Sequence, residues 1–276
     1  MFVRTLEDLR AAGAEKRVAH DTATVVRYLN KADGLGFSFS DVRVSTGTES
    51  VLWYKNHWEA NYVAEGETRL TDLVRDRTWT LTPGSLYCVG PADRHKLEVV
   101  SDARYISVFN PPITGLETHD EDGAYPPTGE IPKGQQEMSV TSVEELRAAG
   151  RELSVADGKV RSMRMLTRSD GLGFTLCNAH LDAGAEGRLW YKHHWEANYI
   201  LGGTGELEHL TSGETWPLAP GTAYMVGPDD PHRVRAATGL HIVSIFNPPL
   251  DGDEVHDGDG ALPPTGPVPP GPESAA

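Results

Sequence analysis

The sequence consists largely of two copies of one internal repeat. Four strings recur at a constant displacement of 137 positions, and their first copies are LWYKNHWEANY at 52–62, VFNPP at 108–112, DGLGF at 33–37 and PPTG at 126–129. The second copy of the longest string reads LWYKHHWEANY at 189–199. A register kept without insertion or deletion over this length indicates two homologous domains of about 135 residues each, an ordinary domain size.

The composition between and after the repeats sets the expected boundaries. The joint TGEIPKGQQEM and the end of the chain are rich in Pro, Gly and polar residues, as linkers and disordered tails are. We therefore expect a first domain over 1–127, a linker over 128–138, a second domain over 139–264 and a flexible tail over 265–276.

Within each half the pattern is mainly β. Each half opens on one short helix, TLEDLRAAG in the first and SVEELRAAG in the second, ended by Gly13 and Gly150. Period-2 runs follow, such as FSFSDVRV at 37–44, with Phe37, Phe39 and Val42 or Val44 as inward residues. Turns every eight to twelve residues are typical of a sandwich or a barrel, and a jelly-roll barrel protects its strand edges.

Charge and cysteine content narrow the function classes. The formal charge of −15 disfavours nucleic acid and anionic membranes as partners, because both need clustered Lys and Arg. No stretch approaches the roughly 20 apolar residues that span a bilayer, and the first residues lack the apolar core of a signal peptide. Cys88 and Cys177 occupy non-equivalent repeat positions, so we expect no disulfide framework and a cytoplasmic protein.

The repeated string at 52–62 carries a polar cluster. In an unbroken strand Trp53, Lys55, His57 and Glu59 would share one face, and Tyr54 would face the other way unless the strand turns. Three such polar groups are costly in a dry core, so this face either lines a polar pocket or is a solvated outer face. Retention of the whole string in the second copy favours the pocket.

A second cluster follows a Pro-Gly turn. Tyr87 lies three residues after Gly84, and His95 follows the turn GPADRH, whose counterpart is GPDDPH. Alone, such a Tyr is usually a core aromatic and such a His a surface or capping residue. The second-half equivalents are Tyr224 and His232.

The spacing around Glu59 resembles the first cupin motif, with Trp53 and Lys55 at positions that hold metal-binding histidines in typical cupins. Tyr87 stands where the second cupin motif has a metal-binding His. This altered pattern resembles the ectoine synthase family. The resemblance is carried by WYKNHWEANY, TPGSLY, DRH, VFNPPITGLETHDEDGAYP and GLGFSF, and it covers nearly all of each half. It implies two tandem cupin (jelly-roll β-barrel) domains.

The resemblance also implies a metal centre. Ectoine synthases are iron-dependent cupins with Glu, Tyr and His ligands, which match Glu59, Tyr87, His95, Glu196, Tyr224 and His232. A mixed O,O,N site with open positions is a relative of the facial triad of non-haem Fe(II). The expected cofactor is Fe(II), one per domain, with Zn as the alternative. Such a metal would polarise a carbonyl or amide oxygen as a Lewis acid.

Further residues match family positions at the substrate site. As catalytic candidates the resemblance gives Tyr54, His57, Glu117, His119, Tyr191, His194, Glu254 and His256. As substrate-binding candidates it gives Arg27, Trp53, Phe109, Arg164, Trp190 and Phe246, and each arginine could hold a carboxylate bidentately. Without the resemblance, Glu117 and His119 would be solvated residues of an acidic loop.

Part of the pocket wall departs from the family. Ala23 and Val160 stand where the family has a Trp, and the family's Thr positions after GLGFSF are Val42 and Arg43 in the first half. In the second half the Thr positions hold Ala179 and His180. This combination is expected of a retained metal site with a changed substrate.

The function implied is a cyclising dehydratase, a carbon-oxygen lyase. Ectoine synthases close N-γ-acetyl-2,4-diaminobutyrate into a cyclic amidine with loss of water, so the expected partner is this or another small polar amino acid derivative. Two alternatives stay open: a non-haem iron oxygenase or isomerase of a different small amino acid derivative, and a binding cupin without catalysis. Because the single-domain family forms homodimers, we expect an intramolecular pseudo-dimer, with further homodimerisation open.

Overall fold

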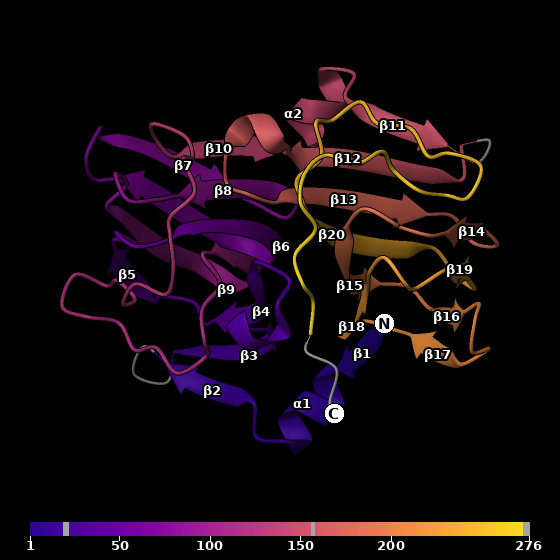
Figure 1. Ribbon diagram of the computed structural model, residues 1–276. Helices are drawn as coiled ribbons and strands as arrows, with labels where there is room; N and C mark the ends of the chain where they lie inside the picture. The colour runs from indigo at the N-terminus through magenta and orange to yellow at the C-terminus, as the bar shows by residue number, and fades with distance from the viewer. Residues whose placement is uncertain (19–21, 156–157, 273–276) are drawn as a thin grey trace. The chain divides into compact units, whose positions relative to one another are not determined.

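The computed structural model describes residues 1–18, 22–155 and 158–272, and its elements are drawn in Figure 1. The chain is mainly β and divides into two compact units. The first-repeat unit comprises Leu9–Glu144 and Asp170–Leu172. The second-repeat unit comprises Met1–Asp8, Glu145–Ser169 and the chain from Gly173 onward.

The first-repeat unit contains one antiparallel sheet of nine strands. Its main path runs β10-β8-β6-β9-β4-β3-β2, with β5 added to β9 and β7 added to β6. The two longest strands carry the sheet from one end of the unit to the other. The bounds are β2 Glu15–Val18, β3 Ala23–Leu29, β4 Ser38–Val44, β5 Glu49–Leu52, β6 Trp58–Asp72, β7 Arg77–Leu81, β8 Ser85–Val89, β9 His95–Asn110 and β10 Ser139–Ser142.

The second-repeat unit has the same order of strands in two sheets. One sheet runs β1-β18-β15-β20-β13-β12-β11 and the other β14-β19-β16-β17, because the equivalents of β6 and β9 are each broken in two. The bounds are β1 Phe2–Thr5, β11 Glu152–Val155, β12 Val160–Leu166, β13 Thr175–Leu181, β14 Glu186–Leu189, β15 Trp195–Gly202, β16 Gly205–His209, β17 Thr215–Leu218, β18 Thr222–Val226, β19 His232–Ala236 and β20 Leu240–Asn247. The tandem jelly-roll prediction is confirmed.

The short helices are present, but each follows a strand that the sequence did not predict. Helix α1 spans Leu6–Ala11 after β1, and α2 spans Val143–Ala148 after β10. Strand β1 pairs with β18 of the second repeat, whereas β10 pairs with β8 of the first. Each unit is thus completed by the opening strand of the other repeat, and the units do not divide where the repeats do. Short single-turn helices η1 and η2 lie at Lys31–Asp33 and Arg168–Asp170.

Strand β4 is buried on both faces. Val42 and Val44 pack against the interior cluster of the first-repeat unit, and Phe39 on the opposite face stacks on Tyr28 with ring centroids 5.4 Å apart. Residues an odd number of positions apart in a strand face opposite ways, so Phe39 and Val42 cannot both point into the barrel. Phe37 is also fully buried.

The expected linker and tail lie against equivalent tryptophans. Trp58 Nε1 donates to the carbonyl of Pro132 at 3.1 Å, and Trp195 Nε1 donates to that of Pro269 at 3.1 Å. A Cβ at Gly134 would lie 2.2 Å from the Trp58 ring, so only glycine fits there. Residues 273–276 of the expected tail lie outside the described residues. Among those described, no helix is long and apolar enough to cross a membrane.

Candidate active site

A tight turn breaks the repeated string before the predicted ligand strand. Strand β5 ends at Leu52 and β6 begins at Trp58, and the turn between them is closed by a hydrogen bond from His57 N to the Tyr54 carbonyl at 3.3 Å. The single shared face expected from strand alternation is therefore wrong. Tyr54 lines a cavity, whereas Lys55 forms an ion pair with Asp122.

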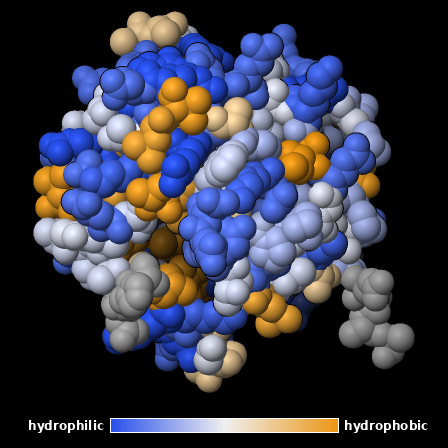
Figure 2. All heavy atoms as spheres, turned by 90° about the vertical axis from the view of Figure 1, so that its left-hand side faces the viewer, coloured by the Kyte–Doolittle hydropathy of each residue, from blue (hydrophilic) through white to orange (hydrophobic). Residues whose placement is uncertain are grey.

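Each unit encloses a cavity at the equivalent place. The first has a volume of about 180 Å³ and the second about 450 Å³. Figure 2 shows the face of the molecule on the left of Figure 1, where hydrophobic residues gather around a hollow. Six predicted site residues line both cavities in equivalent positions, and Glu254 lines the second cavity without its equivalent Glu117 lining the first. In the first-repeat unit the six are Arg27, Tyr54, Glu59, Tyr87, Phe109 and His119.

The predicted carboxylate and phenol ligands lie on adjacent strands. Glu59 is on β6 and Tyr87 on β8, whose register pairs Glu59 with Val89 and Asn61 with Tyr87. Both side chains are buried, and both line the cavity. Burial raises the pKa of Glu59 to about 8, and burial followed by the charge of Glu59 raises the pKa of Tyr87 well above its usual value.

His95 completes this group from the start of β9. The residue is fully buried, and its ring centroid lies 6.4 Å from that of Tyr54 and 6.5 Å from that of Tyr87. Its Nδ1 lies 3.0 Å from the Asp93 carbonyl, which fixes Nδ1 as the donor and leaves Nε2 with a lone pair. Nε2 has no hydrogen-bond partner among the described residues.

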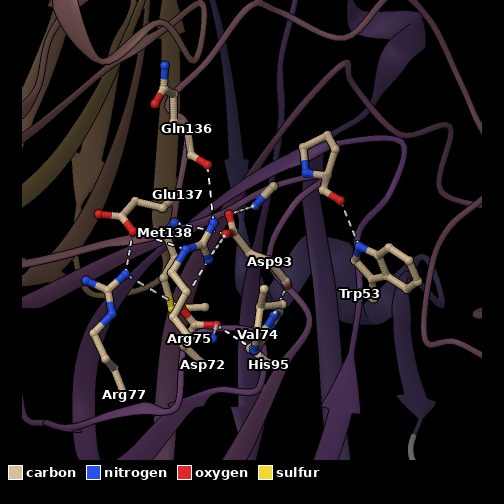
Figure 3. Close-up of polar contacts among 12 residues, drawn as sticks. Trp53, Asp72, Val74, Arg75, Arg77, Asp93, His95, Gln136, Glu137 and Met138 are labelled. Carbon is tan, nitrogen blue, oxygen red and sulfur yellow. Dashed lines mark hydrogen bonds and ion pairs between the residues drawn. The ribbon is translucent and has the colours of Figure 1, made fainter.

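A buried carboxylate network holds the turn before His95 (Figure 3). Asp93 accepts hydrogen bonds from Gly90 N at 2.9 Å and Met138 N at 3.0 Å, and it forms an ion pair with Arg75 at 2.9 Å. Arg75 also pairs with Asp72. The imidazole is thereby oriented by a rigid outer layer of contacts, as metal-ligating histidines usually are.

The second-repeat unit repeats the arrangement, with His209 at the position of Asp72. Asp230 accepts from Gly227 N at 2.8 Å, its carbonyl lies 2.9 Å from His232 Nδ1, and His232 Nε2 has no partner in the described chain. The nitrogen of Met1 contacts Asp230 at 2.6 Å, which matches the contact of Met138 with Asp93. The position equivalent to Arg75 is Ser212, so the guanidinium is absent.

These donor atoms fit a divalent cation. A carboxyl, a phenol and a bare imidazole nitrogen are costly to bury together, and a bound cation would remove the protons of the first two and satisfy the third. Within the described ranges no three His, Cys, Asp or Glu side chains converge on one point. Each predicted group has two side chains of these types, and its third member is the tyrosine.

A tyrosine–histidine pair faces each cavity beside these donors. Tyr54 Oη lies 3.1 Å from His119 Nε2, and Tyr191 Oη lies 3.2 Å from His256 Nε2. Burial raises the pKa of Tyr54 well above its usual value, and burial followed by the charge of Arg27 lowers that of His119. At neutral pH the pair is therefore a phenol beside a neutral imidazole, which can pass one proton between them.

The loop that carries each predicted acid ties its carboxylate to backbone amides. Glu117 accepts from Thr114 N at 2.5 Å and Gly115 N at 2.8 Å. Burial alone would raise the pKa of Glu117, but these amides outweigh it and the pKa is lowered. Glu254 is held in the same way by Gly252 N at 3.0 Å. Both groups are therefore carboxylates at neutral pH and cannot serve as proton donors.

Other predicted residues lie away from the cavities. His57 is buried with Nε2 3.0 Å from Thr128 Oγ1, and His194 contacts Thr265 Oγ1 at 3.0 Å. The indole nitrogen of Trp53 donates to the carbonyl of Pro91 at 2.8 Å, and that of Trp190 donates to Pro228. The structure therefore does not bring these four side chains to the cavity surface.

Sequence reasoning missed three residues at the first site. Asn61 lies two positions after Glu59 and lines the cavity with its Nδ2 unpaired among the described residues. Period-2 alternation from Glu59 would have identified it. Tyr125 stacks on His119 with centroids 4.3 Å apart, and Asp93 anchors His95. Asp93 is close to His95 in the sequence, but its anchoring role depends on Arg75 and Met138 from distant segments, and no local pattern indicates the stacking of Tyr125 on His119.

Known proteins resemble the chain in sequence and in fold. The model of the family described as ectoine synthase matches residues 1–129 and again 138–266. L-ectoine synthase of Shouchella clausii is 40% identical over 126 residues, covering 46% of this chain and 92% of that protein. L-ectoine synthase of Halalkalibacterium halodurans is 42% identical over 126 residues, covering 46% and 96%.

Solved structures share the two-domain fold at low identity. Lactobacillus farciminis oxalate decarboxylase in complex with formate has a TM-score of 0.65 at 11% identity, covering 91% of this chain and 87% of that one. A putative glyoxylate-induced protein from Pseudomonas aeruginosa has a TM-score of 0.64 at 14% identity, covering 85% and 83%. These likenesses show the fold alone, whereas the double match of the family model shows that both halves of this chain belong to the ectoine synthase family.

Proposed function

We propose that the protein is a metal-dependent cyclising dehydratase acting on an N-acyl diamino acid such as N-γ-acetyl-2,4-diaminobutyrate. Membership of the ectoine synthase family supports a cyclising lyase. The observation that carries the proposal is the buried Glu59–Tyr87–His95 group, in which Glu59 and Tyr87 line a cavity and His95 Nε2 has no hydrogen-bond partner among the described residues. The equivalent group in the second repeat has the same features.

Glu59, Tyr87 and His95 would hold one Fe(II), with Glu196, Tyr224 and His232 holding a second, and Zn is the alternative metal. When bound, the metal supplies Lewis acidity toward the oxygen of the acyl group. In the reaction the free amine attacks the amide carbon, a carbon–nitrogen bond forms, and the amide oxygen leaves as water. The product is a cyclic amidine.

The other residues bind substrate and move protons. His119, which is neutral at pH 7, would accept a proton from the attacking amine, and the Tyr54 phenol would donate one toward the leaving oxygen. Arg27 lines the same cavity and would hold the substrate carboxylate. The apolar walls exclude water, which would otherwise oppose a dehydration.

The test combines metal analysis with turnover. Wild-type protein purified with iron should carry about two metals per chain, and Tyr87→Phe and Tyr224→Phe should each carry about one, because each removes one ligand. Release of the cyclic amidine and water from N-γ-acetyl-2,4-diaminobutyrate, measured by mass spectrometry, would support the reaction.

The two parts of the proposal fail separately. Metal without turnover would reject the substrate and retain the metal site, and oxygen consumption would then identify an oxygenase. Protein that binds no iron or zinc would overturn the mechanism. Val89→Ala serves as the control, because Val89 lies in the same strand without being a proposed ligand.

A further inference from the structure

The two cavities differ in their walls more than in their polar groups. The proposed ligands, the arginine, the cavity tyrosine and the histidine beside it are the same in both. Six of the remaining positions that line both cavities become smaller in the second repeat: Tyr105 to Ile242, Tyr125 to Leu262, Val42 to Ala179, Leu97 to Val234, Ser50 to Gly187 and Val25 to Ser162. Three become larger, namely Ala23 to Val160, Ser40 to Cys177 and Val44 to Leu181, so the loss of the two aromatic rings is the main difference.

The second cavity is larger and lacks the two phenol groups that Tyr105 and Tyr125 place in the first. Its volume of about 450 Å³ compares with about 180 Å³ in the first, and two phenol groups are replaced by aliphatic side chains. At the mouth, Leu153 lines the second cavity where the first repeat has Lys16, whose amine is bound to the Gly115 carbonyl. The added space is therefore apolar, and space of this kind favours an aliphatic ligand group.

The cavity arginines are also paired differently. Arg27 lies beside the Tyr125 ring, with 5.9 Å from its guanidinium carbon to the ring centroid, and its Nε has no partner in the described chain. Arg164 has a leucine at the equivalent of Tyr125 and instead forms an ion pair with Glu254 at 3.1 Å. Both side chains of this pair are buried, so a substrate carboxylate in the second cavity would share the Arg164 guanidinium with Glu254.

We propose that the second site takes an N-acyl diamino acid with a longer aliphatic acyl group than the first, and that Ile242 and Leu262 set this preference. This inference rests on the proposed function, because it assigns an acyl substrate to each site. The shared ligands would carry the same cyclisation in both repeats. The first cavity, closed by Tyr105 and Tyr125, would admit only a short acyl group.

The experiment assays each site alone on two probes. Glu59→Gln disables the proposed first site, and Glu196→Gln disables the second. Each protein is given the N-γ-acetyl and the N-γ-hexanoyl derivative of 2,4-diaminobutyrate, and the ratio of kcat/KM for hexanoyl over acetyl is compared. We expect the second site to have a ratio at least about tenfold higher than the first, since single methylene contacts already discriminate by such factors.

Wall exchange then tests the named residues. Ile242→Tyr with Leu262→Tyr, in the Glu59→Gln background, should lower the hexanoyl-to-acetyl ratio by about tenfold or more, because the phenols fill the added space. Tyr125→Leu, in the Glu196→Gln background, should raise the ratio of the first site. Val226→Ile is the matched control, because it changes a buried side chain of the second unit that does not line the cavity.

The outcomes separate this inference from the proposed function. Turnover of the acetyl compound by both sites with equal ratios would overturn the inference and leave the function in place. If neither compound is turned over or binds by calorimetry, the function and the inference are both overturned. If the acetyl compound is turned over and neither site accepts the hexanoyl compound, the inference alone is overturned. Acetyl turnover with a raised ratio at the second site, reversed by the tyrosine variants, is the expected result.

Discussion

The imidazoles of His95 and His232 are oriented by backbone carbonyls, and the carboxylates of Asp93 and Asp230 hold those carbonyls in place. Asp93 accepts from two backbone amides and a guanidinium, all in a buried setting. A single carboxylate thus fixes both the backbone turn and the direction of the ligand nitrogen. The second repeat has the same geometry without the guanidinium, and the contact common to both repeats is the amide of Gly90 or Gly227. The Met138 amide of the first repeat is replaced there by the ammonium group of Met1.

Removal of the Asp93 carboxylate should damage the first site selectively. Asp93→Ala leaves two buried amides without their acceptor and removes one of the carboxylates paired with Arg75, which should lower the free energy of unfolding by about 2–4 kcal/mol. Urea denaturation measures this loss, and metal analysis should show the first site emptied. Asp230→Ala is the counterpart, and equal metal loss at both sites in either variant would contradict the assignment.

A pair of histidines outside the cavities should make stability depend on pH. His180 and His241 stack with ring centroids 4.1 Å apart, and burial, with the His180 charge second, lowers the pKa of His241 to about 4. Between about pH 6.5 and pH 4, His241 is protonated in the unfolded chain but stays neutral in the folded chain. The free energy of unfolding is therefore highest above this window and decreases as the pH falls through it.

We expect this His241 contribution to be roughly 1–2 kcal/mol after allowance for its partial exposure. Urea midpoints measured between pH 7 and 4.5 give the slope for wild type and for His241→Gln. The glutamine variant should show a shallower loss because one titrating group is gone. An identical slope in both proteins would exclude the histidine pair as its source.

For individual residues, the sequence predicted which side chains belong to the cavity better than it predicted where those side chains point. The repeated string indicated that Glu59 faces a pocket, but the turn at 53–57 is closed by two backbone hydrogen bonds that strand alternation does not predict. It sends Tyr54 inward and leaves Trp53 bonded to Pro91. The proximity of Asp93 to His95 is local, yet its role depends on Arg75 and Met138, which arrive from distant segments.

Among the secondary-structure elements, the opening strand of each repeat pairs with a strand of the other repeat. Strand β1 pairs Val3 with Tyr224, and β10 pairs Val140 with Tyr87, so each flanks a proposed ligand tyrosine. The sequence predicted the helices that follow but not this pairing. Because FVRT and SVTS occupy equivalent repeat positions, either strand fits either edge, and no local pattern decides between them.

A matched pair of substitutions tests this pairing. Val140 packs against the core of the first-repeat unit and Val3 against that of the second. Val140→Asp should destabilise the first unit by about 1–3 kcal/mol and weaken its metal site, because a carboxylate is driven into apolar contacts. Val3→Asp should do the same to the second unit. Damage to the opposite unit in each case would refute the pairing.

For the molecule as a whole, the formal charge of −15 means that its carboxylates repel one another and destabilise the folded state. Its exposed ion pairs contribute little individually, so the excess of carboxylates should dominate the response to salt. We expect Tm to rise by about 2–5 °C between low salt and roughly 0.3 M NaCl, as screening shortens the range of that repulsion. A differential scanning calorimetry series, with sucrose of equal osmolality as control, measures it, and a falling Tm would contradict the expectation.

The opening strands also impose an order on synthesis. Strand β10 can close the first-repeat unit as soon as it leaves the ribosome, because β8 is already made. Phe2, by contrast, must wait for Met225, and at about 5–20 residues per second that delay lasts roughly 10–45 s. During that interval the earliest strand has no partner of its own, and an edge vacant in another nascent copy could accept it. Ribosome spacing along the message would then influence how many chains mature as separate molecules.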